Sequence, residues 1–274
     1  MSRLHCYMNW LALDGMGPFR EGPVAATKSA GYDGIQFIDP LDLDALVEAR
    51  THNLGVCSSG RVNIPSEADS LAKAASDAGL ECLTLHVGWG LEDDDEGARL
   101  IEAVLTASAR HRVPLYVETH RATIFQDMQR TVKFIERFPE LEFNGDFSHW
   151  YTGSEMVYGG FERKLEFIQP VLDRVRFLHG RIGNPGSMQV AVTPDDPASY
   201  VGHFRMLWTR SFAAYLRATT PKQPFITFAP ELLAPNIFYA RTFNGAEESD
   251  RWQQSLLLAE IARECFANAL AESS

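Results

Sequence analysis

Short apolar segments alternate along the chain with longer amphipathic segments, and successive apolar segments begin about 30 residues apart, as repeated β-α units do. The apolar segments have the length of buried strands, whereas apolar residues recur at helical spacing in the segments between them. Eight of each, in alternation, predict a single closed (β/α)8 barrel of the α/β class. The predicted strands are Leu4 to Asn9, Gly34 to Ile38, Leu54 to Ser58, Cys82 to Val87, Val113 to Glu118, Leu141 to Asp146, Val175 to His179 and Pro224 to Ala229. The predicted helices are Val24 to Ser29, Leu43 to Arg50, Ser66 to Ala78, Glu96 to Arg110, Ile124 to Phe138, Phe161 to Leu172, Tyr200 to Ala218 and Glu247 to Ala271.

Local signals support these boundaries. Pro139 ends the helix before it, and the acidic run Glu92 to Glu96 is interpreted as a solvated helix start, where negative charge is favourable. A patch for a metal or a basic partner is the alternative interpretation of that run. No low-complexity linker divides the chain, so residues 1–274 are expected to form one domain. The longest irregular stretch, Gly183 to Ala198, is expected to lie above the barrel mouth.

The segment Pro114 to Thr123 passes from a buried strand directly into polar residues. Leu115, Tyr116 and Val117 suit a strand buried on both faces, and Glu118 follows them at once. An unpaired carboxylate is costly in such a place unless a cation or a proton compensates it. Glu118 is therefore predicted to be functional.

Other predicted strands end in the same way. The carboxyl ends of the strands in a (β/α)8 barrel meet at one mouth, where the active sites of such enzymes lie. Three carboxylates and several imidazoles would then share one cavity, and this concentration of negative charge predicts a cation. The polar residues at these ends are His86 with Trp89, Glu118 with His120, Asp146 with His149, His179 with Arg181, and Glu231.

The set Glu118, Asp146, His179 and Glu231 is predicted to bind one divalent metal ion. Oxygen ligands with one imidazole suit Mn²⁺, which is the first expectation, or Mg²⁺, Co²⁺ or Zn²⁺. If Glu118 and Glu231 face each other across a sugar, one can remove a proton next to a carbonyl and the other can return it. The alternative is that the carboxylates form structural ion pairs with Arg121 or Arg241.

The surrounding polar residues leave more than one interpretation open. His149 is expected to contact substrate, with orientation of a metal ligand as the alternative. His86 and Trp89 are expected to form part of a sugar-binding wall, although a histidine on a buried strand is often satisfied by backbone. His120 and Arg121 either belong to the site or point outward to neighbouring loops.

The composition narrows the class of protein further. Hydrophobic residues make up 45% of the chain and charged residues 22%, as in globular proteins. The formal net charge of -11 disfavours nucleic acid as a partner. No stretch is apolar enough for a membrane span and no targeting pattern is evident, so we expect no membrane partner and a cytoplasmic location. The cysteines show no CxxC spacing and are predicted to be reduced: Cys6, Cys57, Cys82 and Cys265.

Several segments together resemble the xylose isomerase-like TIM barrel superfamily of sugar isomerases and epimerases, which also includes ketose 3-epimerases, dehydratases and endonuclease IV type enzymes. The resemblance implies that the Glu, Asp, His and Glu identified above bind the metal, and that the two glutamates are the acid/base pair in epimerases. It also implies a homo-oligomer as one expected assembly. The segments that carry it are Leu115-Tyr-Val-Glu118-Thr-His, Phe143-Asn-Gly-Asp146-Phe-Ser-His149, Phe177-Leu-His179-Gly-Arg181 and Ala229-Pro-Glu231.

Two departures from that pattern shape the expected chemistry. The third predicted strand leads into Ser58-Ser59-Gly60, and no Asp-x-His pair follows His179, so only a mononuclear site is expected. Arg181 stands where many members have lysine or another histidine, and a guanidinium suits a substrate hydroxyl, carboxylate or phosphate.

These observations predict a metal-dependent isomerase or epimerase that acts on a small sugar or sugar derivative. A metal-dependent lyase or dehydratase on a keto-sugar or keto-glycoside is the alternative, because it needs the same residues. An endonuclease-like phosphodiesterase and a non-catalytic sugar-binding barrel are the less favoured classes.

Overall fold

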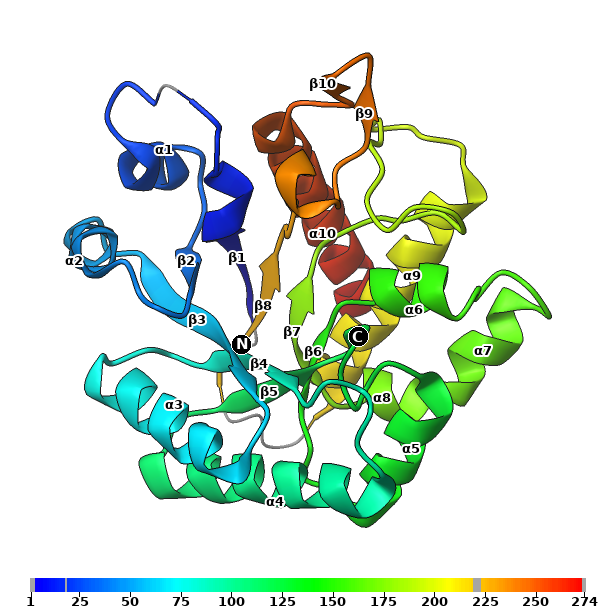
Figure 1. Ribbon diagram of the computed structural model, residues 1–274. Coiled ribbons are helices and arrows are strands. Elements are labelled where there is room, and N and C mark those ends of the chain that lie inside the picture. The colour runs from blue at the N-terminus through cyan, green and yellow to red at the C-terminus, as the bar shows by residue number, and fades with distance from the viewer. Residues whose placement is uncertain (1–2, 18, 219–222, 273–274) are drawn as a thin grey trace.

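The computed structural model describes residues 3–17, 19–218 and 223–272, and in them eight parallel strands close into a barrel in sequence order (Figure 1). Each strand pairs with the next, and β1 pairs with β8 to close the ring. The predicted (β/α)8 fold is confirmed. The strands are β1 Arg3–Asn9, β2 Gly34–Ile38, β3 Gly55–Val62, β4 Leu83–Val87, β5 Leu115–Glu118, β6 Phe143–Gly145, β7 Val175–His179 and β8 Phe225–Ala229.

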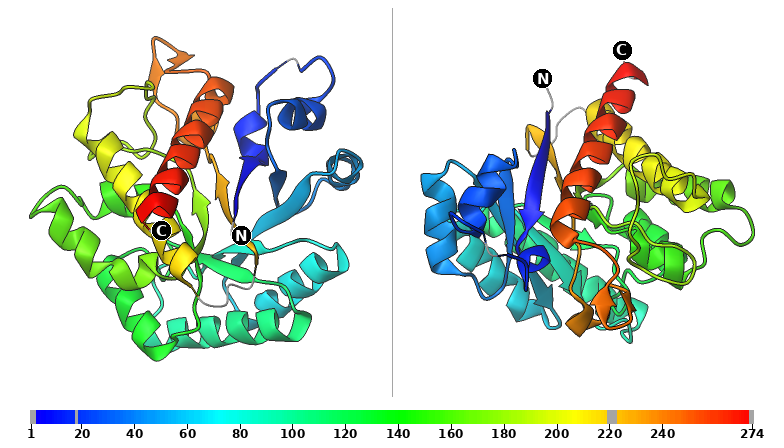
Figure 2. Two further views of the ribbon diagram at one scale, coloured as in Figure 1. Left: turned by 180° about the vertical axis from the view of Figure 1, so that it is seen from behind. Right: turned by 90° about the horizontal axis from the view of Figure 1, so that it is seen from above.

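Helices surround the strands, and Figure 2 shows α9 and α10 packed side by side on the outside of the barrel. None of the helices in the described part of the chain is long and apolar enough to cross a membrane. The α-helices are α1 Pro23–Ser29, α2 Leu43–Thr51, α3 Pro65–Asp77, α4 Asp94–His111, α5 Met128–Arg137, α6 Ser148–Gly153, α7 Phe161–Phe167, α8 Gln169–Leu172, α9 Ser199–Arg217 and α10 Arg251–Glu272. Short 3-10 helices follow β1 (η1, Trp10–Leu13) and β8 (η2, Pro235–Ile237), and a hairpin of β9, Thr242–Phe243, and β10, Ala246–Glu247, precedes α10.

Several boundaries differ from the prediction for local reasons. The helix predicted from Ile124 begins at Met128, because the Asp127 side chain accepts a hydrogen bond from the backbone N–H of Arg130 and caps the helix there. The helix predicted over residues 161–172 is divided into α7 and α8, and Pro170 at the start of α8 cannot continue the hydrogen bonding of α7. The last helix was predicted from Glu247, but that residue lies in β10.

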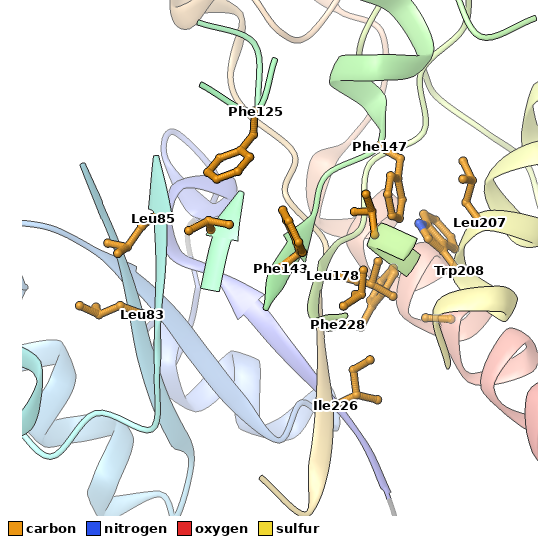
Figure 3. Packing of buried hydrophobic residues seen from close by; sticks show 14 of the residues in the cluster. Leu83, Leu85, Phe125, Phe143, Phe147, Leu178, Leu207, Trp208, Ile226 and Phe228 are labelled. Carbon is orange, nitrogen blue, oxygen red and sulfur yellow. The ribbon is translucent and has the colours of Figure 1, made fainter. Parts of the chain in front are cut away.

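The main hydrophobic core lies between the barrel and the helices. Figure 3 shows Leu178 of β7 and Phe228 of β8 directed toward Trp208 of α9. The rings of Trp208 and Phe228 meet edge to face, with their centroids 5.0 Å apart. These contacts fix α9 against the two strands whose ends lead into the loops at the mouth.

A second, smaller apolar cluster joins residues from across the barrel, in its interior. Successive strand residues point to opposite faces, so Glu118 lies on the same face of β5 as Tyr116, and His179 on the same face of β7 as Phe177. The apolar layer therefore supports a polar layer nearer the carboxyl ends of the strands. Its members are Tyr7, Cys57, Cys82, Tyr116, Phe177 and Ala229.

Two glycines make room for the aromatic ring at the base of this layer. A Cβ atom on Gly34 would lie 2.4 Å from Cζ of Tyr7, and one on Gly55 would lie 2.0 Å from its hydroxyl oxygen. The Tyr7 hydroxyl donates a hydrogen bond to the carboxylate of Glu81. The amino-terminal end of the barrel is thus filled by side chains, which leaves the opposite end for chemistry.

The stretch Gly183 to Ala198 follows β7 and is tied to the loop after β8. The Gln189 side-chain amide donates to the Leu233 carbonyl at 3.0 Å and accepts from the Leu233 N–H at 2.9 Å. These two loops, which lie at the top of Figure 1, follow the strands that position His179 and Glu231.

Candidate functional site

The four predicted metal ligands come together at the carboxyl ends of four neighbouring strands. Glu118 and His179 are the last residues of β5 and β7, Asp146 follows β6, and Glu231 lies two residues beyond β8. One potential ligand atom from each lies within 4.8 Å of the others. Glu118 and Asp146 are fully buried, and Glu231 keeps a small exposed fraction. The arrangement has the donor types and the compactness that a divalent ion requires.

Opposing environments act on the two glutamates. Burial alone would raise the pKa of Glu118, but His179 and His86 hold it well below its usual range. Burial raises the pKa of Glu231, and the nearby His179 and Arg181 offset this only in part. One carboxylate is thus held ionised while the other is able to carry a proton, which is the difference that an acid/base pair needs.

His179 contacts both of these glutamates through the same ring nitrogen. Its Nδ1 is 3.3 Å from Oε2 of Glu118 and 3.5 Å from Oε1 of Glu231, while its Nε2 is 3.0 Å from Oε1 of Gln36. Burial would lower the pKa of His179, but Glu231 and Glu118 raise it to about 9. Nδ1 is therefore the nitrogen that faces the acidic cluster.

Arg181 is buried inside the site and pairs with two of the carboxylates. Its Nη2 contacts Oδ2 of Asp146 and lies 3.0 Å from Oε2 of Glu231. Its Nε donates to Oγ of Ser148 at 3.0 Å, and that hydroxyl donates to Oδ1 of Asp146 at 2.6 Å. The guanidinium carbon lies 4.6 Å from the centroid of the Tyr239 ring. The guanidinium of Arg181, which was predicted from sequence to bind substrate, therefore forms an ion pair with Asp146 in the structure.

The ion pairs considered from sequence involve different partners. Arg241 pairs with Glu248, and the guanidinium of Arg121 lies over the Tyr239 ring with 4.9 Å from its carbon to the ring centroid. The cluster has three carboxylates and one guanidinium, that of Arg181, so a formal charge of two negative units remains when the carboxylates are ionised and His179 is neutral. Glu118 Oε1 is buried and forms no well-aligned hydrogen bond in the described residues, although Nε2 of His86 lies 3.3 Å away. A divalent cation would supply the missing charge and a partner for this oxygen, so the residues present fit such an ion.

Three histidines form a row along one wall of the site. Nε2 of His86 lies 3.3 Å from Oε1 of Glu118, and the ring centroids are 4.1 Å apart for His86 and His120 and 3.8 Å apart for His120 and His149. His149 also lies 3.5 Å from Asp146, measured from Nε2 to Oδ2. Burial and His149 lower the pKa of His120 to about 2, so its ring stays neutral. His120, undecided from sequence, belongs to the site, and with His86 and Glu118 it forms a second group of potential metal ligands.

Trp89 is half exposed at the rim, and one face of its ring is covered. The guanidinium carbon of Arg61 lies 4.4 Å from the Trp89 ring centroid, and Arg61 also lies 3.4 Å from His86, from Nη2 to Nδ1. Trp150 and Tyr151 on α6 are buried in the core. The indole N–H of Trp150 donates to the Phe125 carbonyl at 3.0 Å.

Sequence reasoning missed a layer of neutral polar residues around the ligands. Asn144 donates through Nδ2 to Oε2 of Glu118 at 2.9 Å, and the same nitrogen lies 3.1 Å from Nδ1 of His179. A polar residue inside an otherwise apolar strand, such as Gln36 in Gly-Ile-Gln-Phe-Ile, was the available signal. The residues missed are Asn9, Gln36, Thr84, Asn144 and Tyr239.

No protein-family profile and no curated protein matches this sequence. Solved structures match along nearly the whole chain. The probable 3-DHS dehydratase AsbF of Bacillus anthracis, involved in petrobactin synthesis, is 14% identical with a TM-score of 0.58, over 95% of this chain and 97% of that one. A xylose isomerase-like TIM barrel protein of Mycobacterium smegmatis, in complex with magnesium, is 15% identical with a TM-score of 0.58, over 98% of each chain.

A sugar phosphate isomerase/epimerase of Parabacteroides distasonis is also similar, at 14% identity and a TM-score of 0.58, over 94% of this chain and 97% of that one. At such identities the likeness establishes the fold. The resemblance drawn from sequence to xylose isomerase-like TIM barrels is confirmed at that level, and the activities named for these proteins belong to them.

Proposed function

We propose that the chain is a divalent-metal-dependent sugar isomerase or epimerase that moves a proton at a carbon next to a carbonyl. The observation that carries this proposal is the cluster of Glu118, Asp146, His179 and Glu231, whose ligand atoms lie within 4.8 Å of one another against a single guanidinium. The similarity to a sugar phosphate isomerase/epimerase supports the same class of reaction.

These four residues would hold the ion. When bound, it would supply positive charge that stabilises the oxyanion of an enediolate. Mn²⁺ is our first choice for a site of three carboxylates and one imidazole, with Mg²⁺, Co²⁺ and Zn²⁺ as alternatives. The magnesium bound by the matched Mycobacterium smegmatis protein supports a hard divalent ion.

Glu118 and Glu231 would transfer the proton. Glu118 has a lowered pKa and is ionised at rest, so it suits the base that removes a proton from carbon. Glu231 has a raised pKa and suits the acid that returns one. Both carboxylates lie near the same atom, Nδ1 of His179, which supports a role for both at one substrate carbon.

Arg181 and His149 would hold the oxygens of the substrate. Nη1 of Arg181 and Nδ1 of His149 are buried and have no hydrogen-bond partner in the described residues. A hydroxyl, carboxylate or phosphate oxygen of the substrate can accept a hydrogen bond from the guanidinium of Arg181. A substrate hydroxyl can also donate a hydrogen bond to the imidazole of His149 or accept one from it. His86 and Trp89 would form the wall beside them.

Elimination is the second candidate reaction. One of the matched structures is a probable dehydratase, and loss of a β-substituent after proton removal needs the same base and the same cation. His120 and His149, whose rings lie side by side, offer ring N–H groups that could donate a hydrogen bond to a departing oxygen. The mass of the product separates the reactions, since isomerisation conserves mass and elimination does not.

Glutamine substitution of the two glutamates tests the proposal. Purified protein with Mn²⁺ is incubated with a panel of keto-sugars and aldoses in deuterated water, and exchange at carbon is followed by NMR. Glu118→Gln and Glu231→Gln are each expected to slow exchange by about 10²–10⁴-fold, the range for loss of a general acid or base.

Glu81→Gln is the matched control, because this half-buried glutamate lies at the opposite end of the barrel, where it accepts from Tyr7. It should exchange substrate protons at the wild-type rate. Wild-type rates in both active-site variants would contradict the proposal.

A further inference from the structure

Gln36 contacts His179, one of the proposed metal ligands, from a strand that carries no proposed ligand. Oε1 of Gln36, on β2, lies 3.0 Å from Nε2 of His179, and both side chains are buried. We propose that Gln36 is a positioning residue that fixes the tautomer of His179, so that Nδ1 presents its lone pair to the metal. The inference rests on the metal site of the proposed function, and it adds the residues that orient His179 within that site.

A neutral imidazole carries one N–H and one lone pair, and the hydrogen bond at one nitrogen decides which is which. A carbonyl oxygen at Nε2 requires that Nε2 carry the hydrogen. The lone pair is then on Nδ1, which faces Glu118 and Glu231. The amide group of Gln36 must therefore present its oxygen, and not its nitrogen, to His179.

A backbone N–H fixes the orientation of this amide. The N–H of Leu11 can only donate, and it lies 3.0 Å from Oδ1 of Asn9. This leaves Nδ2 of Asn9 to donate to Oε1 of Gln36, at 3.0 Å. Thr84 accepts from Nε2 of Gln36 at 2.9 Å. This chain of hydrogen bonds, from Leu11 through Asn9 to Gln36, determines that Gln36 presents its oxygen to His179 and that Nε2 of His179 carries the hydrogen.

The other side of the imidazole supports the same tautomer independently. An ionised carboxylate can only accept, so Glu118 requires Asn144 to present its Nδ2, which is 2.9 Å from Oε2 of Glu118. The same nitrogen lies 3.1 Å from Nδ1 of His179, and in the neutral imidazole, the form that a metal binds, its N–H group matches a lone pair on Nδ1. Once the proton that Glu118 and Glu231 favour on Nδ1 has left, both networks suit the same neutral tautomer.

Metal affinity provides the first test. Mn²⁺ alone is titrated into wild-type protein and into Gln36→Met, which keeps the length of the side chain but has no carbonyl to accept from Nε2. The dissociation constant should rise about 10- to 100-fold, the usual cost of losing a partner behind a ligand. Gln36→Glu should restore binding, because its carboxylate accepts from His179, Asn9 and Thr84 alike.

Asn9→Asp tests the network at a residue that does not touch His179. Its carboxylate cannot donate to Gln36, so the Gln36 amide should turn and offer N–H to Nε2 of His179, which places the lone pair on the wrong nitrogen. A negative charge alone would strengthen cation binding, whereas the network predicts about tenfold weaker binding or more. The control Asn268→Asp, exposed on α10, adds the same charge far from the network.

Nitrogen-15 NMR of histidine in Zn²⁺-loaded protein provides the direct readout, with His179→Ala to assign the signal. We expect the proton on Nε2 and coordination through Nδ1. Coordination through Nε2, unchanged affinity in folded Gln36→Met, or tighter binding in Asn9→Asp would each overturn the inference. Wild-type protein that binds neither ion would overturn the proposed function, and the inference with it. Far-UV circular dichroism and urea unfolding establish that each variant is folded.

Discussion

The two halves of the barrel contribute different chemistry to the same layer. β5 to β8 lead into every member of the four-residue cluster and into Arg181, so this half carries the charge. β1, β2 and β4 contribute Asn9, Gln36 and Thr84, which are neutral and linked to one another by hydrogen bonds. We infer from this difference that strands without a proposed ligand still determine how a ligand is presented. His86 on β4 is the exception, since it contacts Glu118 directly.

The largest expected effect on stability comes from removing the guanidinium that compensates the carboxylates on β5 to β8. Arg181→Met leaves Asp146 and Glu231 without their guanidinium, so the free energy of unfolding of metal-free protein should fall by about 3–5 kcal/mol. Arg61→Met, at the half-buried rim beside Trp89, should change it by about 1 kcal/mol or less. Urea unfolding at pH 7 measures both values. Similar losses of unfolding free energy in Arg181→Met and Arg61→Met would contradict the view that buried charge is concentrated on β5 to β8.

The second effect is a pH dependence that belongs to the charged half alone. Burial would lower the pKa of His179, but Glu231 and Glu118 raise it to about 9, so metal-free protein holds a proton there at neutral pH. The proton must leave before Nδ1 can bind a metal. Apparent Mn²⁺ affinity should therefore rise about tenfold per pH unit toward pH 9.

Calorimetry in buffers of different ionisation enthalpy measures this release, and about one proton per ion is expected at pH 7. The side chains of Asn9, Gln36 and Thr84 do not titrate, so they contribute nothing to the change of Mn²⁺ affinity with pH. Binding without proton release would contradict the assignment of His179 as a ligand.

The smallest expected effect lies in the neutral half. Thr84→Val removes the acceptor of the Gln36 N–H group, so stability should fall by about 1 kcal/mol and Mn²⁺ affinity by about fivefold or less. Thr131→Val on α5, which removes a buried hydroxyl hydrogen bond to the Asp127 carbonyl, should lose similar stability with unchanged affinity. Equal metal affinity in the two variants would show that Thr84 contributes only to folding.

Most of the fold could be predicted from sequence because apolar residues recur at different spacings in strands and in helices. The bounds of β2 and β7 agree with the prediction. The short helix α6 and the hairpin of β9 and β10 were missed, since elements of a few residues contain too little of a period to detect. Their positions depend on contacts with distant parts of the chain.

The ligand cluster could be predicted because carboxylates are costly at the ends of buried strands, and such residues stand out in sequence. The ion pairs of Arg181 with Asp146 and Glu231 could not, because sequence alone does not show which carboxylates a guanidinium contacts. Gln36 was missed for a different reason. The oxygen and the nitrogen of an amide have opposite functions, and only its partners in space determine which one faces His179.

The hydrogen bond from the backbone of Leu11 to Asn9 has a consequence for protein design. Grafting only Glu118, Asp146, His179 and Glu231 onto another eight-stranded scaffold would transfer the ligands without the groups that orient them. The graft should include Asn9, Gln36 and the turn at Leu11, even though none of them would touch the ion. The smallest transferable unit of this centre therefore extends along the sequence from Asn9 to Glu231.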